Sequence, residues 1–175
     1  MADRILVATD GSEAGARAVA CAAELSDKLG RGLSIMHVHL HTRPSAELTR
    51  LAETEHLLDH LSRHERFADR PAAGSLGAFY EATRSEVERA WVIEAIGGEI
   101  LARACAQAEG AGARDIRSRV AAGDYADEIL DMAEAEGASM IVLGRRGLGR
   151  LREALLGSVT QKVLHATDRT TVIVR

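Results

Sequence analysis

The sequence predicts an α/β fold in which an open, parallel, five-stranded sheet is covered by helices on both faces. Two observations carry this prediction. Five short apolar runs, rich in β-branched residues, alternate with longer stretches of helical periodicity, which is the pattern of repeated strand–helix–strand units. The first and fourth runs are almost continuously apolar, as expected of parallel strands that are buried on both faces.

In order along the chain, the strands are expected at residues 4–9, 33–40, 116–122, 139–143 and 171–174. The helices between them have recognisable ends. Ser12 can cap a helix over residues 13–29, and Gly30 is suited to ending it because glycine adopts the left-handed conformation easily. Asp124 and Gly137 mark the two ends of the helix between the third and fourth strands in the same way.

The connection between the second and third strands, residues 42–115, is longer than a single crossover helix requires. Residues 45–67 have the periodicity of an amphipathic helix, and residues 68–79 have the composition of a flexible link. The first of these helices is therefore interpreted as an insertion.

Residues 81–109 predict one long crossover helix, with Gly97-Gly98 as a candidate break. No internal repeat is evident. We therefore expect a single domain over residues 1–175 that carries a helical insertion at about 42–80.

Composition limits the classes of partner. The net charge of −4 provides no basic field for nucleic acid, and an aromatic content of 3% offers few platforms for stacked bases. The chain enters an apolar strand too early for a secretory signal, and no apolar run approaches the length of a membrane span. We expect no nucleic acid or membrane partner, a cytoplasmic location, and buried, reduced thiols at Cys21 and Cys105.

The segment between the fourth strand and the last helix has the skeleton Gly144-x2-Gly147-x9-Gly157-Ser158. In open α/β sheets, ligands bind beyond the carboxyl ends of the strands, where the winding reverses. Glycines let main-chain amides approach a phosphate closely, and the N-terminus of a helix favours an anion. The segment therefore fits a phosphate-binding loop, with a simple turn and helix start as the alternative.

The sequence of this segment excludes two well-known classes of phosphate-binding loop. It lacks the G-K-[ST] of a Walker A loop, and no G-x-G-x-x-G follows the first strand. Ser158 and Gln161 match a capping box. Arg145 and Arg146 are candidates for neutralising phosphate, and a solvated pair of surface arginines is the alternative.

The four-position spacing resembles the signature of the ATP-binding branch of the universal stress protein family. The similarity extends to "VATDGSE" at the end of the first strand, "MHV" in the second, "AAG" at the end of the third and "ALLGSVTQKVLHAT" near the C-terminus. The family implies a Rossmann-like, adenine nucleotide alpha hydrolase-like fold with strand order 3-2-1-4-5. It also implies that adenosine lies over the crevice between the first and fourth strands.

The resemblance implies a nucleotide site that can be carried onto this chain residue by residue. The residues implied around adenine and ribose are Ala8, Thr9 and Asp10, with Val38 lining the adenine pocket and Gly123 and Leu143 forming its floor. The residues implied around the ribose and the phosphates are Gly144, Gly147, Gly157, Ser158 and Val159, together with the candidates Arg145 and Arg146. For Asp10, a second helix cap is the alternative role.

Two positions depart from the family pattern. Arg145 stands where the family usually has a small hydroxyl residue, which would restrict or recharge the phosphate site. Thr170-Thr171 replaces a common Pro-Val before the last strand, through which family members often dimerise. Residues 172–174 still provide an apolar edge, so a homodimer through the C-terminal strand is expected.

The histidines form two patterns that permit shared metal ligation: His37, His39 and His41 alternate along a strand, and His56, His60 and His64 follow at helical spacing. No cysteine or carboxylate obviously completes a site. Hydrogen-bonded or solvated histidines are therefore the favoured interpretation, and no metal site is predicted. The alternative is an insertion that folds over the crevice and brings the two sets together.

The leading hypothesis is a stress-response protein that binds ATP or AMP, with Mg²⁺ accompanying ATP, and acts through ligand-dependent dimer or partner contacts. The alternatives are a dimeric regulatory module that binds no nucleotide and meets an unidentified protein partner, and a variant that binds cyclic AMP. No nucleophile, base and orienting group occur at recognisable spacing, so no enzyme activity beyond slow ATP hydrolysis is expected.

Overall fold

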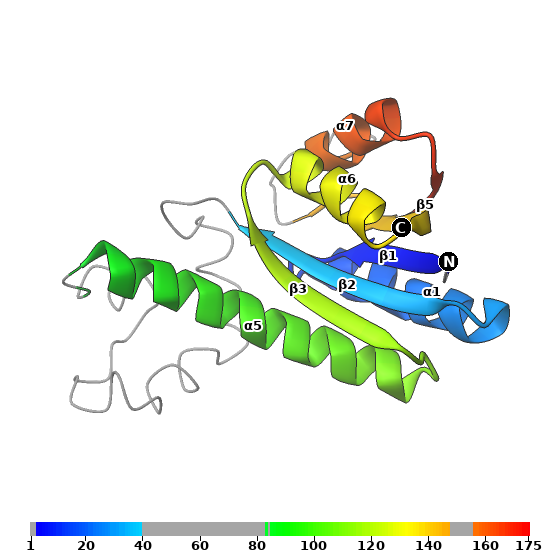
Figure 1. Cartoon of the computed structure of the whole chain (residues 1–175), viewed down its shortest axis with the longest axis horizontal. Helices are drawn as coiled ribbons and strands as arrows, with labels where there is room; N and C mark the ends of the chain where they lie inside the picture. The colour runs from blue at the N-terminus through cyan, green and yellow to red at the C-terminus, as the bar shows by residue number, and fades with distance from the viewer. Residues whose placement is uncertain (1–2, 40–82, 84, 148–155) are drawn as a thin grey trace.

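The computed structural model describes residues 3–39, 83, 85–147 and 156–175. Its elements are β1 (Arg4–Ala8), α1 (Glu13–Leu29), β2 (Gly32–His39), α5 (Glu86–Gly110), β3 (Ile116–Ala122), α6 (Tyr125–Ala135), β4 (Ala138–Gly144), α7 (Ser158–Ala166) and β5 (Thr170–Val174). The strands form a parallel sheet in the order β3-β2-β1-β4-β5 (Figure 1). The predicted fold class and strand order are therefore confirmed.

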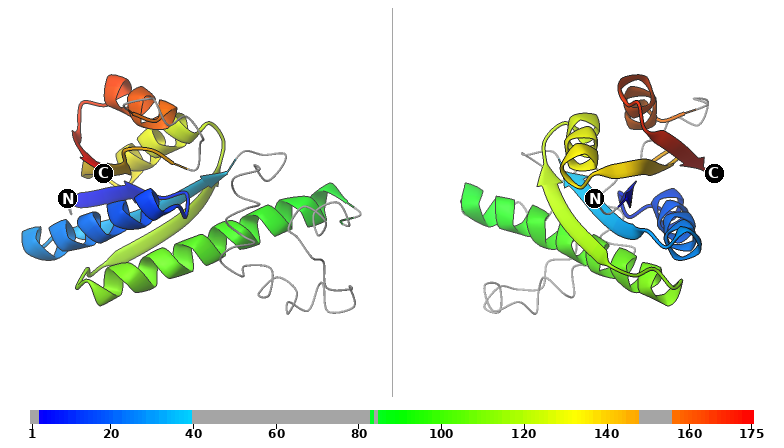
Figure 2. Two further views of the ribbon diagram at one scale, coloured as in Figure 1. Left: turned by 180° about the vertical axis from the view of Figure 1, so that it is seen from behind. Right: turned by 45° about the vertical axis from the view of Figure 1, so that its right-hand side comes forward.

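Helices cover both faces of the sheet, with α1 and α5 on one face and α6 and α7 on the other (Figures 1 and 2). Successive residues of β1 enter opposite cores: Ile5 and Val7 pack beneath α1 and α5, and Leu6 packs beneath α6. All three side chains are fully buried. This two-sided burial explains why the first apolar run shows no alternation with polar residues.

The predicted ends of α1 and α6 are confirmed. The Ser12 side chain accepts a hydrogen bond that caps α1, and Gly30 ends this helix in the left-handed conformation with a φ of 65°. The Asp124 side chain caps α6, and Gly137 follows that helix with a φ of 62°. These signals are reliable because each depends on only a few neighbouring residues.

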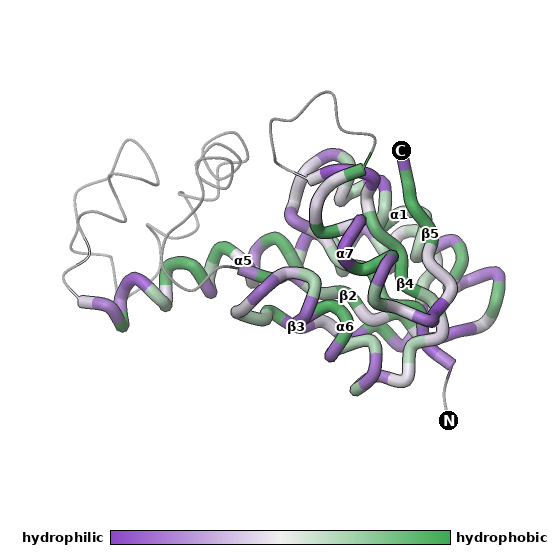
Figure 3. The backbone as a smooth tube through the Cα atoms, turned by 90° about the horizontal axis from the view of Figure 1, so that it is seen from above, coloured by the Kyte–Doolittle hydropathy of each residue, from purple (hydrophilic) through white to green (hydrophobic). Residues whose placement is uncertain are grey.

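The candidate break at Gly97-Gly98 is wrong, because α5 runs through both glycines without interruption. Gly97 is buried where α5 meets the sheet, whereas a side chain at Gly98 would point into open space. Packing of the helix against the sheet at Gly97 outweighs the weak helix propensity of the two glycines. The amino-terminal part of α5 extends beyond the sheet (Figures 1 and 3).

The expected capping box of the last helix is also wrong. Gly157 is the N-cap of α7, and within the described part of the chain no side chain makes the capping hydrogen bond. Ser158 is already the first helical residue, and its side chain is exposed. Gln161 instead donates its main-chain N–H to the Gly157 carbonyl oxygen, at 3.0 Å, as an ordinary residue of the first turn.

The expectations for the cysteines, for a membrane span and for the insertion have different outcomes. Cys21 and Cys105 are free thiols, but both are half-buried rather than buried. Cys105 packs against the margin of the core that α1 and α5 share with the sheet. Within the described ranges, no helix combines the length and apolar character of a membrane crossing. The expected insertion at about 42–80 lies outside the described residues.

Candidate functional site

The candidate site lies at the carboxyl ends of β1 and β4, which pair side by side up to Ala8 and Leu143. From this edge β1 turns into α1, while β4 runs into the glycine loop. A β-carbon at Gly144 would lie 3.1 Å from the Ala14 carbonyl oxygen, so the end of β4 approaches the first turn of α1 closely. In the strand order β3-β2-β1-β4-β5, the direction in which successive strands are added reverses between β1 and β4, so this edge is the switch point of the sheet.

The turn between β1 and α1 is held by its own polar side chains. Gly11 donates its N–H to Thr9 Oγ1 at 3.2 Å, and Ser12 donates its N–H to Asp10 Oδ1 at 3.0 Å. Gly11 has a φ of 79°, which favours glycine. A β-carbon at Gly15 would lie 2.6 Å from Thr9 Oγ1, so α1 also needs a glycine there. The turn is therefore compact and fixes the Asp10 carboxylate.

The glycine loop meets this turn at Gly147. A β-carbon at Gly147 would overlap the Oδ2 atom of Asp10, so the absence of a side chain lets the loop backbone lie against the carboxylate. Asp10 and Gly147 belong to the sequence motifs around two different strands, and the structure brings them together. This close approach is the geometry that the glycine spacing predicts for a main-chain cradle.

The two described ends of the loop are joined by main-chain hydrogen bonds. Gly157 donates its N–H to the Arg145 carbonyl oxygen at 2.9 Å, and Arg145 donates its own N–H to the Val174 carbonyl oxygen at 2.7 Å. Buried Thr160 adds a side-chain bond from its Oγ1 to the Gly144 carbonyl oxygen, at 3.0 Å. The start of α7 is thus anchored on the ends of β4 and β5.

The start of α7 suits an anion. A helix begins with N–H groups that have no partner within the helix, and among the described residues no side chain caps those of α7. The helix dipole adds partial positive charge at this end. Arg145 and Arg146 are both half-buried beside Gly157, whose β-carbon position is 3.5 Å from the Arg146 Cα. The donors and the charge point to a phosphate or similar anion.

An apolar floor adjoins these polar groups. Val38 and Leu143 are buried in the core beneath α6 and α7, and Ala8 and Val159 pack against the same core. Gly123, which follows β3, donates its N–H to the His39 carbonyl oxygen at 3.1 Å. One face of the sheet therefore carries four residues expected from separate parts of the sequence: Ala8, Val38, Leu143 and Val159.

Comparison with known proteins identifies the family. The model of the Universal stress protein family matches residues 1–175. The chain belongs to the universal stress protein family. It is 31% identical, over the full length of both chains, to the universal stress protein YxiE of Bacillus subtilis.

Solved structures show the same fold for this universal stress protein. A universal stress protein crystallised in complex with cAMP aligns with a TM-score of 0.61 and 21% identity, covering 99% of this chain and 96% of that one. The universal stress protein from Archaeoglobus fulgidus in complex with dAMP aligns with a TM-score of 0.56 and 18% identity over 100% of both chains. At these identities the likeness establishes the fold.

Sequence reasoning missed one residue that supports the site of this universal stress protein, Thr160, and did not connect a second residue, His37, with the site. Thr160 is missed because its bond to Gly144 depends on how α7 packs against the end of β4, and the local sequence does not show this packing. His37 was placed on one strand face with His39, and it proves to be a buried side chain whose Nδ1 lies 2.9 Å from the Thr9 carbonyl oxygen. The alternation of the "HVH" run was the available signal for its inward direction.

The histidine patterns gain no support as a metal site. Among the described residues, no group of three or more histidines, cysteines, aspartates or glutamates could hold a metal ion. His37 follows the favoured interpretation of a hydrogen-bonded histidine. His39 ends β2 and is half-buried. The other members of the two patterns, His41, His56, His60 and His64, lie outside the described residues.

Proposed function

We propose that this universal stress protein binds an adenine nucleotide, ATP or AMP, at the carboxyl edge of β1 and β4. The observation that carries the proposal is the approach of Gly147 to Asp10, where a β-carbon would overlap the Asp10 carboxylate. The uncapped start of α7 lies at the other end of the same loop. Together these features provide a fixed carboxylate for ribose hydroxyls and main-chain N–H donors, which no described side chain caps, for phosphate.

Each part of the nucleotide has a proposed partner. Adenine lies over the floor formed by Ala8, Val38, Gly123 and Leu143, and Asp10 accepts hydrogen bonds from the ribose, with Thr9 beside it. The phosphates are held by Gly144, Gly147, Gly157, Ser158 and Val159, with Arg145 and Arg146 supplying positive charge. Mg²⁺ accompanies ATP. The binding of cAMP and of dAMP that is named for two solved relatives supports the choice of an adenine nucleotide.

The proposed outcome of binding is a change in contacts with other chains during the stress response in the cytoplasm. β5 is an edge strand with half-buried Val172, Ile173 and Val174, so a second copy of the chain can extend the sheet there. We also propose that the single domain carries its insertion at about 42–80 as a further partner surface. The protein acts by binding and has no catalytic role beyond slow hydrolysis of ATP.

Titration calorimetry of the full chain with ATP, AMP and cyclic AMP, each with and without Mg²⁺, tests the proposal. Gly147→Ala is expected to weaken binding by at least about tenfold, because its new methyl group displaces Asp10. Gly98→Ala, whose methyl group meets no neighbour among the described residues, is the matched control. Absence of binding up to about 1 mM nucleotide would contradict the proposal and favour the nucleotide-free regulatory module.

A further inference from the structure

His37 lies on β2 and is only 4% exposed. Its Nδ1 is 2.9 Å from the Thr9 carbonyl oxygen. A carbonyl oxygen only accepts hydrogen bonds, so Nδ1 carries the ring hydrogen and donates it. The Nε2 atom then holds a lone pair, and this buried atom has no hydrogen-bond partner among the described residues. Burial lowers the pKa of His37, which favours the neutral ring, and the bond to the Thr9 carbonyl selects the tautomer.

The acceptor of this bond, the Thr9 carbonyl oxygen, lies just beyond the end of the β1–β2 pairing. The main-chain pairing of β1 with β2 ends at Ala8 and Met36, so Thr9 is the first residue beyond the ladder. Thr9 donates its N–H to the Met36 carbonyl oxygen at 2.9 Å, and His37 supplies the donor for the Thr9 carbonyl oxygen. The histidine ring therefore ties the peptide that leads into Asp10 to the neighbouring strand.

The helix α5 holds the ring from its other side. A β-carbon at Gly97 would lie 3.0 Å from His37 Cδ2 and 3.1 Å from Val120 Cγ1. The ring thus lies between β2, which carries it, and the α5 backbone at Gly97, and a side chain at that position would press on it. This contact also explains why α5 has a glycine at position 97.

We propose that His37 is a positioning residue for the nucleotide: its ring, held beneath Gly97, fixes the Thr9 carbonyl and thereby the place of the Asp10 carboxylate. His37 does not touch the ligand. Asp10 has one carboxylate oxygen on the Ser12 N–H and the other facing Gly147, so a small rotation of the Thr9–Asp10 peptide moves both. The inference rests on the proposed nucleotide site, but the positioning itself concerns this chain alone.

The test replaces His37 with two residues that differ in one hydrogen-bond donor. In His37→Asn, the side-chain amide nitrogen is the same number of bonds from the backbone as Nδ1, so it can donate to Thr9. In His37→Leu, that donor is lost. The first readout needs no ligand: hydrogen exchange of the Gly11 and Ser12 amides, which bond to Thr9 Oγ1 and Asp10 Oδ1. The second readout is the Kd for ATP.

We expect His37→Leu to raise exchange at Gly11 and Ser12, and to weaken ATP binding, by about tenfold each, since one hydrogen bond to a buried acceptor is lost. His37→Asn should stay within about threefold of the original protein in both readouts. A merely structural role would make the two variants alike, because both remove the ring from beneath Gly97. Equal behaviour of the two variants, or no effect of leucine, would overturn the proposal.

A second pair of variants covers the case in which His37→Leu fails to fold. Gly97→Ala presses on the ring and should raise exchange at Gly11 and Ser12, whereas Gly98→Ala should not. Equal exchange in these two variants would also overturn the proposal. If the original protein binds no nucleotide, the proposed function fails, and the exchange measurements still decide whether His37 positions the turn.

Discussion

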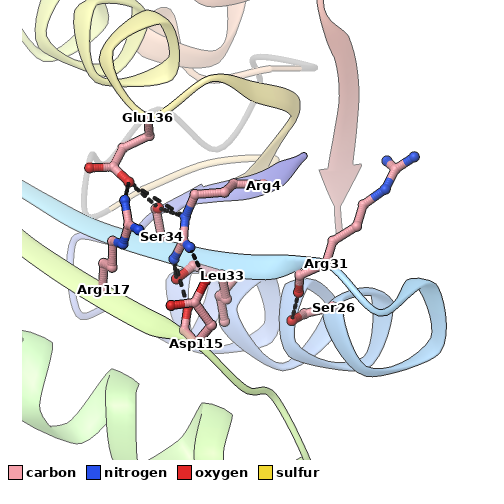
Figure 4. A network of polar contacts seen from close by, with 8 residues as sticks. All are labelled: Arg4, Ser26, Arg31, Leu33, Ser34, Asp115, Arg117 and Glu136. Atoms are coloured by element: carbon pink, nitrogen blue, oxygen red, sulfur yellow. Dashed lines mark hydrogen bonds and ion pairs between the residues drawn. The ribbon is translucent and has the colours of Figure 1, made fainter. Parts of the chain in front are cut away.

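The buried guanidinium of Arg4 forms an ion pair with Asp115 across the intervening strand β2 (Figure 4). Arg4 begins β1 and Asp115 precedes β3, so the pair joins strands that do not touch in the sheet. The same guanidinium donates to the Leu33 carbonyl oxygen at 2.7 Å and to Ser34 Oγ at 2.9 Å. We call this set of contacts from Arg4 to Asp115, Leu33 and Ser34 the Arg4 clamp. It lies at the amino edge of the sheet, opposite the candidate nucleotide site.

Removing the clamp is expected to cost stability without changing nucleotide affinity. Arg4→Met keeps most of the side-chain volume but removes the guanidinium donor from the Leu33 carbonyl and the Ser34 hydroxyl. Because Asp115 is 59% exposed, its carboxylate can be solvated, so we expect a loss of about 2–4 kcal/mol in the free energy of unfolding. Urea denaturation measures this loss, and calorimetry measures the affinity.

The control for this variant is Lys28→Met. Lys28 is 81% exposed and lies 3.5 Å from Asp27, so removal of its charge should change stability by less than about 0.5 kcal/mol. Similar losses in the two variants would show that Arg4 contributes no more than a surface charge.

The two glycines of α5 should respond oppositely to alanine. Gly98→Ala adds a methyl group in open space and is expected to stabilise the protein by up to about 1 kcal/mol through helix propensity. Gly97→Ala gains the same propensity but crowds His37 and Val120, which packing holds in place. We expect Gly97→Ala to be the less stable variant by at least about 1 kcal/mol in thermal and urea unfolding. Equal stabilisation by Gly97→Ala and Gly98→Ala would show that His37 and Val120 shift to accommodate the added methyl group.

This pair of glycines illustrates what the sequence could and could not predict. The strands and the ends of α1 were predictable because apolar runs and caps such as Ser12 and Gly30 act over a few residues. Gly97-Gly98 looked like a break because two glycines weaken an isolated helix. Only the contact of Gly97 with His37, which joins distant parts of the chain, shows why a glycine is needed there.

The candidate site also combines features that the sequence predicted with features that it did not. The glycine spacing predicted which residues lie at the loop, because glycine positions record a close backbone approach. Asp10 and Gly147 were both named from sequence, and their contact follows from the strand order. The supporting bonds of His37 and Thr160 were not predictable, because each joins a side chain to a carbonyl on another element. The capping box failed since Gly157, one residue earlier, takes the cap position.

Stability should fall on mild acidification because of His37. Burial lowers its pKa in the folded protein, although the Thr9 carbonyl and Asp10 oppose the shift, while His39 adds to it. Above the unfolded pKa of 6.5 neither state binds the proton and this contribution is constant. Below 6.5 the unfolded chain binds it first, so stability declines, by at most about 1.4 kcal/mol per pH unit, until the folded pKa is reached.

The variant His37→Asn isolates this effect. Urea denaturation at pH 7.5, 6.5 and 5.5 should show a smaller decline for the variant than for the original protein. Parallel pH profiles for the two proteins would mean that other groups account for the whole dependence.

Asp124 is expected to link α6 to α7 in a charge-dependent way. Its side chain caps α6 and also accepts a hydrogen bond from Lys162 of α7 at 3.1 Å, and this bond lowers the pKa of Asp124 below its usual value. The stabilisation is therefore present at neutral pH and lost as pH falls through the folded pKa, below 3.8. Asp124→Asn keeps the cap and removes the charge, whereas Asp124→Ala removes both. The thermal midpoint should fall more for alanine, and equal midpoints would deny the cap a role.

Thr160 should hold the glycine loop through a single hydrogen bond. Its Oγ1 donates to the Gly144 carbonyl oxygen at 3.0 Å, and the side chain is 4% exposed. Thr160→Val keeps the shape but leaves that carbonyl without this donor, so we expect a loss of about 1–2 kcal/mol in stability. Because Gly144 opens the loop, the same variant should weaken ATP binding by several-fold. Thr160→Ser keeps the hydroxyl and should retain the affinity while losing stability only through its missing methyl group. If valine and serine variants bind ATP equally, the bond to Gly144 serves the fold alone and does not position the loop.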